Sequence, residues 1–360
     1  MHILKGYTKQ EISWMMYDWA NSAHSVIIVT LLPIFFDTVA GYTADSVSSM
    51  STWGYATSIA MLIVALAAPF LGVFGDIRGM RKKLFSFFML LGVAACAGMA
   101  FTPGMDFTSG PVAAGKVASL ILVLYIVSVI GFDASAIYYD AFLTDVTIED
   151  RMDKVSTMGY GLGYIGGSTI PLLIFLIMNL VGVPMLTCLA FVFGLTAVWW
   201  LAFSLPLLKN CEQTSGKPYE KGDVARSIKG VGTTIKEIIA NKPMLIYILS
   251  YFFYIDGVHT VISMATTYGT NLGLDSTGMM LALLLVQILG LPFCLLYIKC
   301  SEKFGARTMV GFGICVYMFI CIFAFFMNSL WQFWVLAVLC ATSQGGIQAL
   351  SRSMYGKLIP

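Results

Sequence analysis

Residues 52–83 of the chain read TWGYATSIAMLIVALAAPFLGVFGDIRGMRKK. The stretch 52–75 contains no charged residue, and it exceeds the roughly 20 apolar residues that a helix needs to cross the hydrocarbon core of a bilayer. The charged turn 76–83 ends this run and leads into another apolar one. Because the same alternation recurs along the chain, the sequence predicts a bundle of membrane-spanning helices.

The composition of all 360 residues agrees with this prediction. Hydrophobic residues make up 58% and charged residues 11%, whereas a soluble domain carries about 45–50% and about 25%. So few charges cannot cover a water-soluble surface, which excludes soluble enzymes, nucleic-acid-binding proteins and secreted disulfide scaffolds. The eight cysteines include no C-x-x-C pair, so we expect no disulfide framework, no metal site and no cofactor.

Ten runs are long and apolar enough to cross the bilayer as helices, whose backbone hydrogen bonds are satisfied internally. We expect an all-α integral membrane protein with spans at residues 14–36, 52–75, 84–103, 117–141, 159–181, 184–208, 244–268, 277–298, 308–328 and 331–350.

The basic residues predict the orientation of these spans. If the N-terminus is cytoplasmic, all of the 21 Lys and Arg residues except Lys116 lie on the cytoplasmic side. Since cytoplasmic loops are enriched in Lys and Arg, we expect a cytoplasmic N-terminus. In a bacterium the expected location is the plasma membrane.

A polar, basic stretch at 209–243 divides the chain. Its favoured interpretation is a solvated cytoplasmic linker. The linker separates an N-terminal bundle of six helices, 1–208, from a C-terminal bundle of four, 244–360.

The two bundles share a polar pattern on their first helices. It has the form Asp-x-x-(Asn/His)-(Ser/Thr)-x-x-Ser, and spacings of three, four and seven residues place its members on one helix face. The first copy comprises Asp18, Asn21, Ser22 and Ser25 and the second, offset by 238 residues, comprises Asp256, His259, Thr260 and Ser263. This pattern indicates an internal repeat.

Several motifs resemble those of a known transporter family. The loop 72–83 is similar to the signature between helices 2 and 3 of major facilitator transporters, with Met80 where a basic residue is usual. Resemblance to the vacuolar amino-acid effluxer family and its bacterial relatives rests on YDWANSA (17–23), GYGLGYIGG (159–167), YIDGV (254–258) and QGGIQALSRS (344–353).

The resemblance implies a major facilitator-type helix bundle that moves a small polar solute by alternating access. An amino acid is the solute that it implies. Such transporters have twelve helices, so we expect the second bundle to be truncated and two more spans to follow Pro360. The alternative is a non-transporting membrane remnant, or a sensing or binding module on the same fold.

Ionisable side chains inside a bilayer cost about 2.5–3.5 kcal/mol or more to insert, so they usually face a cavity or a partner. We therefore expect a substrate and proton pathway that comprises Asp18, Asn21, Ser22, Ser25, Asp133, Asp140, Asp256, His259 and Thr260. The competing interpretation is structural hydrogen bonding between helices.

The loop 72–83 has a different expected role. Gly72 and Gly79 permit close backbone approach and a tight turn, Asp76 can cap a helix end, and Arg81 can pair with carboxylates or lipid phosphates. We expect these four residues to form a conformational latch. In the fifth span, Gly159, Gly163 and Gly167 form an expected face for close helix packing.

An enzyme is not expected. Tyr17-Asp18 and Tyr139-Asp140 match half of the intramembrane aspartyl protease pattern, but the partner motif Gly-x-Gly-Asp is absent. There is no P-loop for ATP either. We expect no catalytic residues, and the expected partners are a small-molecule solute, a coupling proton and the lipid bilayer, without nucleic acid.

Overall fold

The computed structural model describes residues 4–43, 49–216, 232–233 and 235–358. The chain forms two compact units. Unit 1 comprises Met1–Trp19, Val146–Thr169 and Gly232–Pro360, and unit 2 comprises Ala20–Asp145 and Ile170–Val231. Much of the predicted linker, 217–231 and 234, lies outside the described residues.

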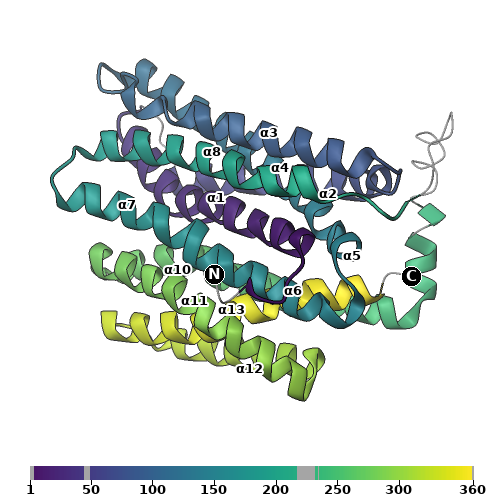
Figure 1. Ribbon diagram of the computed structural model, residues 1–360. Coiled ribbons are helices and arrows are strands. Elements are labelled where there is room, and N and C mark those ends of the chain that lie inside the picture. Colours follow the sequence, from purple (N-terminus) through teal and green to yellow (C-terminus); the bar gives the residue numbers. More distant parts are fainter. Residues whose placement is uncertain (1–3, 44–48, 217–231, 234, 359–360) are drawn as a thin grey trace. The chain divides into compact units, whose positions relative to one another are not determined.

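In the described part of the chain, ten helical segments are long and apolar enough to cross a membrane, one for each predicted span. The all-α membrane fold is therefore confirmed. The main helices (Figure 1) are α1 (Lys9–Ala40), α2 (Ser49–Gly75), α3 (Met80–Met99), α4 (Pro111–Ala141), α5 (Leu143–Val146), α6 (Glu149–Leu162), α7 (Thr169–Leu180), α8 (Met185–Asn210), α10 (Lys242–Asn271), α11 (Ser276–Phe304), α12 (Ala306–Phe325) and α13 (Leu330–Leu358).

Two helices extend well beyond the spans that hydropathy predicts. α6 begins at Glu149, before the predicted start at 159, and α13 continues to Leu358, past the predicted end at 350. Hydropathy marks the part of a helix that lies in hydrocarbon, whereas backbone hydrogen bonding continues through the polar residues beyond it. Both extensions belong to unit 1.

A π-helical turn, Gly163–Ser168, joins α6 to α7. It interrupts the α-helical register on which the expected alignment of Gly159, Gly163 and Gly167 depends. The glycines that approach α1 in unit 1 are instead Gly159 and Gly166. A Cβ atom on Gly159 would contact the carboxylate of Asp18, and one on Gly166 would contact the indole ring of Trp19.

In unit 2, α3 packs against α4 and α8, and α2 packs against α4. The backbones of α3 and α4 touch at two glycines. A Cβ atom on Gly131 would lie 2.5 Å from the amide nitrogen of Gly92 and 2.8 Å from the carbonyl oxygen of Phe88. Small residues at a crossing allow membrane helices to approach this closely and to gain van der Waals contact.

In unit 1, α13 packs against α11, α12 and α6, and α11 also packs against α6 (Figure 1). The buried core includes Ile347 and Leu350 on α13 together with Tyr317 and Ile320 on α12. α13 is therefore the helix that the other members of this unit share.

The variant Gly131→Ala tests the crossing of α3 and α4. The added methyl group would meet backbone atoms, which cannot rotate away, so we expect a loss of about 1–3 kcal/mol of stability. The measurement is the melting temperature of the purified protein in detergent. Gly115→Ala on the same helix is the matched control, because nothing lies within 4 Å of its Cβ position. Equal melting temperatures for the two variants would contradict this crossing.

Candidate functional site

α13 carries a buried arginine in unit 1. Nη2 of Arg352 lies 3.0 Å from Oδ2 of Asp18 on α1, and Nη1 lies 3.5 Å from Oδ1. The two side chains are 7% and 8% exposed. Desolvation of charges costs several kcal/mol per ion unless they are paired and hydrogen-bonded. Asp18 therefore supplies the countercharge that a buried guanidinium requires.

The guanidinium of Arg352 has further partners on α1 and α6. Nε and Nη2 donate to the hydroxyl and the carbonyl oxygen of Ser156, at 2.8 and 3.0 Å. The guanidinium carbon lies 4.5 Å from the ring centroids of Trp14 and of Tyr160. A cation over an aromatic face is stabilised electrostatically, and more strongly where water is excluded. Arg352 thus joins α1, α6 and α13.

The neighbouring turns of α13 also contact α6. The hydroxyl of Ser156 donates to the carbonyl oxygen of Ala349 at 2.8 Å. Asp153 accepts a hydrogen bond from Ser353 at 2.6 Å and pairs with Lys357 at 2.8 Å. We use the name polar seam for the set Asp18, Asp153, Ser156, Ala349, Arg352, Ser353 and Lys357.

A second ion pair fixes the beginning of α1 to α6. Glu11 is buried and accepts hydrogen bonds from Arg151 at 2.7 and 2.8 Å and from the hydroxyl of Thr147 at 2.7 Å. It also forms a reciprocal capping box with Thr8. These contacts therefore fix α1 against α6 about two helical turns before Asp18.

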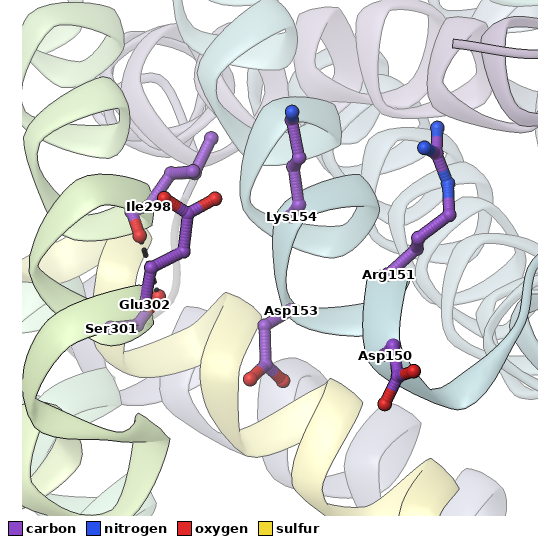
Figure 2. A pocket seen from close by; sticks show the side chains of 7 residues that line it. All are labelled: Asp150, Arg151, Asp153, Lys154, Ile298, Ser301 and Glu302. Carbon is purple, nitrogen blue, oxygen red and sulfur yellow. Dashed lines mark hydrogen bonds between the residues drawn. The ribbon is translucent and has the colours of Figure 1, made fainter. Parts of the chain in front are cut away.

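A polar cavity of about 280 Å³ lies between α6 and α11. Figure 2 shows Arg151 and Lys154 pointing toward one end of it and Asp150 and Asp153 toward the other. Arg151 and Asp153 already belong to the ion pairs described above. The cavity is lined by Asp150, Arg151, Asp153, Lys154, Ile298, Ser301 and Glu302.

The other predicted residues of α1 continue the face of Asp18 into unit 2. Since α1 is one continuous helix, the spacing places Asn21, Ser22 and Ser25 on that face. Asn21 is buried, and Ser22 and Ser25 are half-buried.

The matching stripe on α10 turns away from the other helices of unit 1. On the opposite face of α10, the hydroxyls of Tyr247 and Tyr254 hydrogen-bond the carbonyl oxygen and the hydroxyl of Ser351 on α13, at 2.5 and 2.6 Å. The ion pair that Asp18 forms is with Arg352 on α13. All four residues of the α10 stripe are exposed: Asp256, His259, Thr260 and Ser263.

The two predicted carboxylates of α4 have different surroundings in unit 2. Asp140 is exposed near the end of the helix. Asp133 is half-buried, and its Oδ2 atom is shielded from solvent without a hydrogen-bond partner among the described residues. An unpaired buried polar atom costs free energy, which distinguishes Asp133 from Asp140.

The predicted latch loop forms the turn between α2 and α3. Gly79 has a φ angle of 82°, which glycine adopts without steric cost. Arg81 is buried, donates to the carbonyl oxygen of Ala141 at 3.0 Å and forms an ion pair with Asp145 on α5. Arg81 thus connects this turn to the end of α4. Of the other two predicted residues, Gly72 is half-buried and Asp76 is exposed.

The sequence did not point to Arg352 as a site residue, although it is part of the quoted segment 344–353. It follows the predicted end of the last span at 350, so it counted as a basic residue beyond the membrane. A helix continued past 350 places Ala349, Arg352 and Ser353 on one face. Arg352 could have been identified as a site residue only by extending the last helix past residue 350.

Removing one charge of the Asp18–Arg352 pair should destabilise the protein more than removing both. Asp18→Asn leaves a buried guanidinium without its countercharge, which costs about 3–5 kcal/mol. We expect the double variant Asp18→Asn/Arg352→Gln to melt at a higher temperature than Asp18→Asn. The control is Arg307→Gln at the exposed start of α12. Additive losses in this double-mutant cycle would contradict the pairing.

Comparison with known sequences gives close relatives. The family described as "Vacuole effluxer Atg22 like" matches residues 38–152 and 144–360. The "Uncharacterized MFS-type transporter YxiO" of Bacillus subtilis is 42% identical over 366 residues, which cover 99% of this chain and 83% of that protein. "Autophagy-related protein 22-1" of Penicillium rubens is 24% identical over 243 residues, which cover 60% of this chain and 41% of that protein.

Solved structures show the fold. The proton:xylose symporter XylE bound to 6-bromo-6-deoxy-D-glucose has a TM-score of 0.64 at 16% identity, covering 97% of this chain and 85% of that chain. The inward open conformation of XylE from E. coli has a TM-score of 0.53 at 14% identity, covering 96% of this chain and 86% of that chain. The resemblance inferred from the sequence motifs is confirmed. The chain belongs to the vacuole effluxer Atg22-like family of major facilitator superfamily transporters.

Proposed function

We propose that this chain is a secondary transporter that moves a small polar solute by alternating access. The observation that carries the proposal is the buried Asp18–Arg352 pair within membrane-spanning helices. Ionisable groups at such positions are costly and usually belong to substrate or ion pathways. The pair joins α1 of the predicted six-helix bundle, 1–208, to α13 of the predicted four-helix bundle, 244–360.

The polar seam is proposed to be the cytoplasmic gate between these bundles. Its contacts are ion pairs and hydrogen bonds, whose groups water can solvate when the seam separates. A seam of apolar side chains would instead expose apolar surface each time that it opened. The seam residues lie in the first half of α1, in the first half of the span Glu149–Leu180 that begins with α6, and in the last turns of α13. The distribution of Lys and Arg assigns these ends of the helices to the cytoplasmic side.

The proposed pathway leads from the gate along the polar face of α1, Asn21, Ser22 and Ser25. Hydroxyl and amide groups can hydrogen-bond a polar solute there. The remaining proposed pathway residues, on α4 and α10, are Asp133, Asp140, Asp256, His259 and Thr260. The linker 209–243 is proposed to join the two bundles, and Gly72, Asp76, Gly79 and Arg81 to form a latch on the same side of the membrane.

An amino acid is the proposed solute, because the family is described as an effluxer and the sequence motifs resemble vacuolar amino-acid effluxers. A proton is the proposed coupling ion. XylE, which has the same fold, is described as a proton symporter, and Asp18, Asp133 and Asp256 are carboxylates that can take up a proton. Efflux across a plasma membrane, with a cytoplasmic N-terminus, is the corresponding physiological direction.

Transport in proteoliposomes tests this function. We expect accumulation of radiolabelled amino acids when a pH gradient is imposed, and its loss in Arg352→Lys. Lysine keeps the charge that Asp18 requires but loses the planar fork and its stacking on two rings. Glu149→Gln, which changes an exposed carboxylate in the first turn of α6, should transport like the unmodified protein.

The coupling role of the pathway carboxylates has a separate expected result. Asp256→Asn should abolish accumulation against a gradient and retain some solute exchange, because the amide cannot carry the proton. Accumulation that is independent of the pH gradient would contradict proton coupling. If amino acids, sugars and nucleosides all fail to cross with the unmodified protein, the non-transporting alternative gains support.

A further inference from the structure

The residues that follow α8 in unit 2 return to the turn between α2 and α3. α8 ends at Asn210, and Cys211 has extended backbone angles. The side chain of Gln213 then donates from Nε2 to the carbonyl oxygen of Gly75 at 2.9 Å. Its Oε1 atom accepts from the amide groups of Gly79 at 2.9 Å and of Arg81 at 3.3 Å.

One side chain therefore caps two helices. Gly75 is the last residue of α2, and Gly79 directly precedes α3. The ends of helices leave carbonyl and amide groups without partners inside the helix. Gly79 itself supplies no side-chain cap to α3, so Gln213 provides from a distant part of the sequence what the turn lacks.

The next two residues hold the carboxylate that pairs with Arg81. Oδ1 of Asp145 accepts hydrogen bonds from the backbone amides of Thr214 and Ser215, both at 3.0 Å, and from their hydroxyls at 2.8 and 2.9 Å. Oδ2 of Asp145 forms the ion pair with Arg81. The carboxylate therefore binds the latch arginine on one side and the 214–215 backbone on the other.

Gly216, at the end of this segment, packs against the same turn. Its φ angle is 116°, and a Cβ atom there would lie 2.5 Å from the carbonyl oxygen of Asp76. The backbone of the segment and the backbone of the turn are thus in direct contact. This approach is possible because residue 216 has no side chain.

We propose that Gln213–Ser215 belongs to the latch, together with the loop 72–83 and the Arg81–Asp145 pair. Gln213 is the residue that positions the turn between α2 and α3. The contacts of Gln213–Ser215 release together with the Arg81–Asp145 pair. The sequence patterns assigned the latch to the loop 72–83 and residues 209–243 to a solvated linker. The proposal instead makes the first linker residues a bound component of the latch. Its role in the transport cycle rests on the proposed function, whereas the cooperative release does not.

The chain carries a native reporter for this release. Cys211 is fully buried beside the segment, and burial raises the pKa of its thiol to about 12. A thiol reacts through its thiolate, so a buried thiol of this kind is inert until the surrounding structure opens. Two other buried cysteines of unit 2, Cys96 and Cys188, lie within membrane-spanning helices and serve as internal controls.

The experiment measures the rate at which a charged, water-soluble maleimide labels Cys211 in the purified full chain, with mass spectrometry to identify the labelled cysteine. In Gln213→Ala we expect labelling about tenfold faster or more, because three hydrogen bonds that oppose local opening are lost. Gln213→Glu keeps the acceptor for Gly79 and Arg81 but not the donor to Gly75, so an intermediate rate is expected. Glu212→Ala, at an exposed neighbour, should leave the rate unchanged.

Cooperative release predicts that Asp145→Asn accelerates labelling of Cys211 to a similar extent and that Gln213→Ala adds little to it. Equal acceleration at Cys96 and Cys188 would indicate general destabilisation and overturn a positioning role for Gln213. An unchanged rate in Gln213→Ala, or multiplicative effects in the double variant, would overturn the proposal as well. No transport is measured, so failure of the proposed transport function leaves these results interpretable.

Discussion

The burial of the Arg352 guanidinium is the constraint on which the rest of unit 1 depends. A charge in a site with little water needs a countercharge and hydrogen-bond acceptors, and these come from Asp18 and Ser156 on two other helices. α13 must therefore remain helical past the apolar span. Gly159 must lack a side chain, because a Cβ atom there would contact the carboxylate of Asp18.

The same physical solution recurs at Arg81 in unit 2. This guanidinium is also buried at a helix end and also pairs with a carboxylate, Asp145, whose second oxygen is held by backbone and hydroxyl donors. In each case the arginine joins segments that are distant in the sequence. Arginine suits this task because its planar fork supplies several donors while its charge persists at every relevant pH.

Polar contacts of this kind suit a protein that must change conformation. An apolar helix interface gains free energy from close packing and loses it all on separation, whereas ion pairs and hydrogen bonds can exchange their partners for water. The polar seam of unit 1 and the contacts of Arg81, Asp145 and Gln213 in unit 2 concentrate such groups at helix ends. The glycine crossing of α3 and α4 packs backbone against backbone and is expected to stay closed.

Hydropathy alone determined the ten spans and the all-α fold, because a bilayer leaves the backbone of an apolar segment few alternatives to a helix. Helical spacing likewise placed Asp18, Asn21, Ser22 and Ser25 on one face. The partner of Asp18 was out of reach, since Arg352 is 334 residues away and lies beyond the apolar run, and the use of Gln213 as a cap for α2 and α3 leaves no local pattern. These pairings depend on which helix faces meet and how closely they approach. Packing between the helices decides this, and hydropathy cannot predict it because it is nearly the same for all the segments.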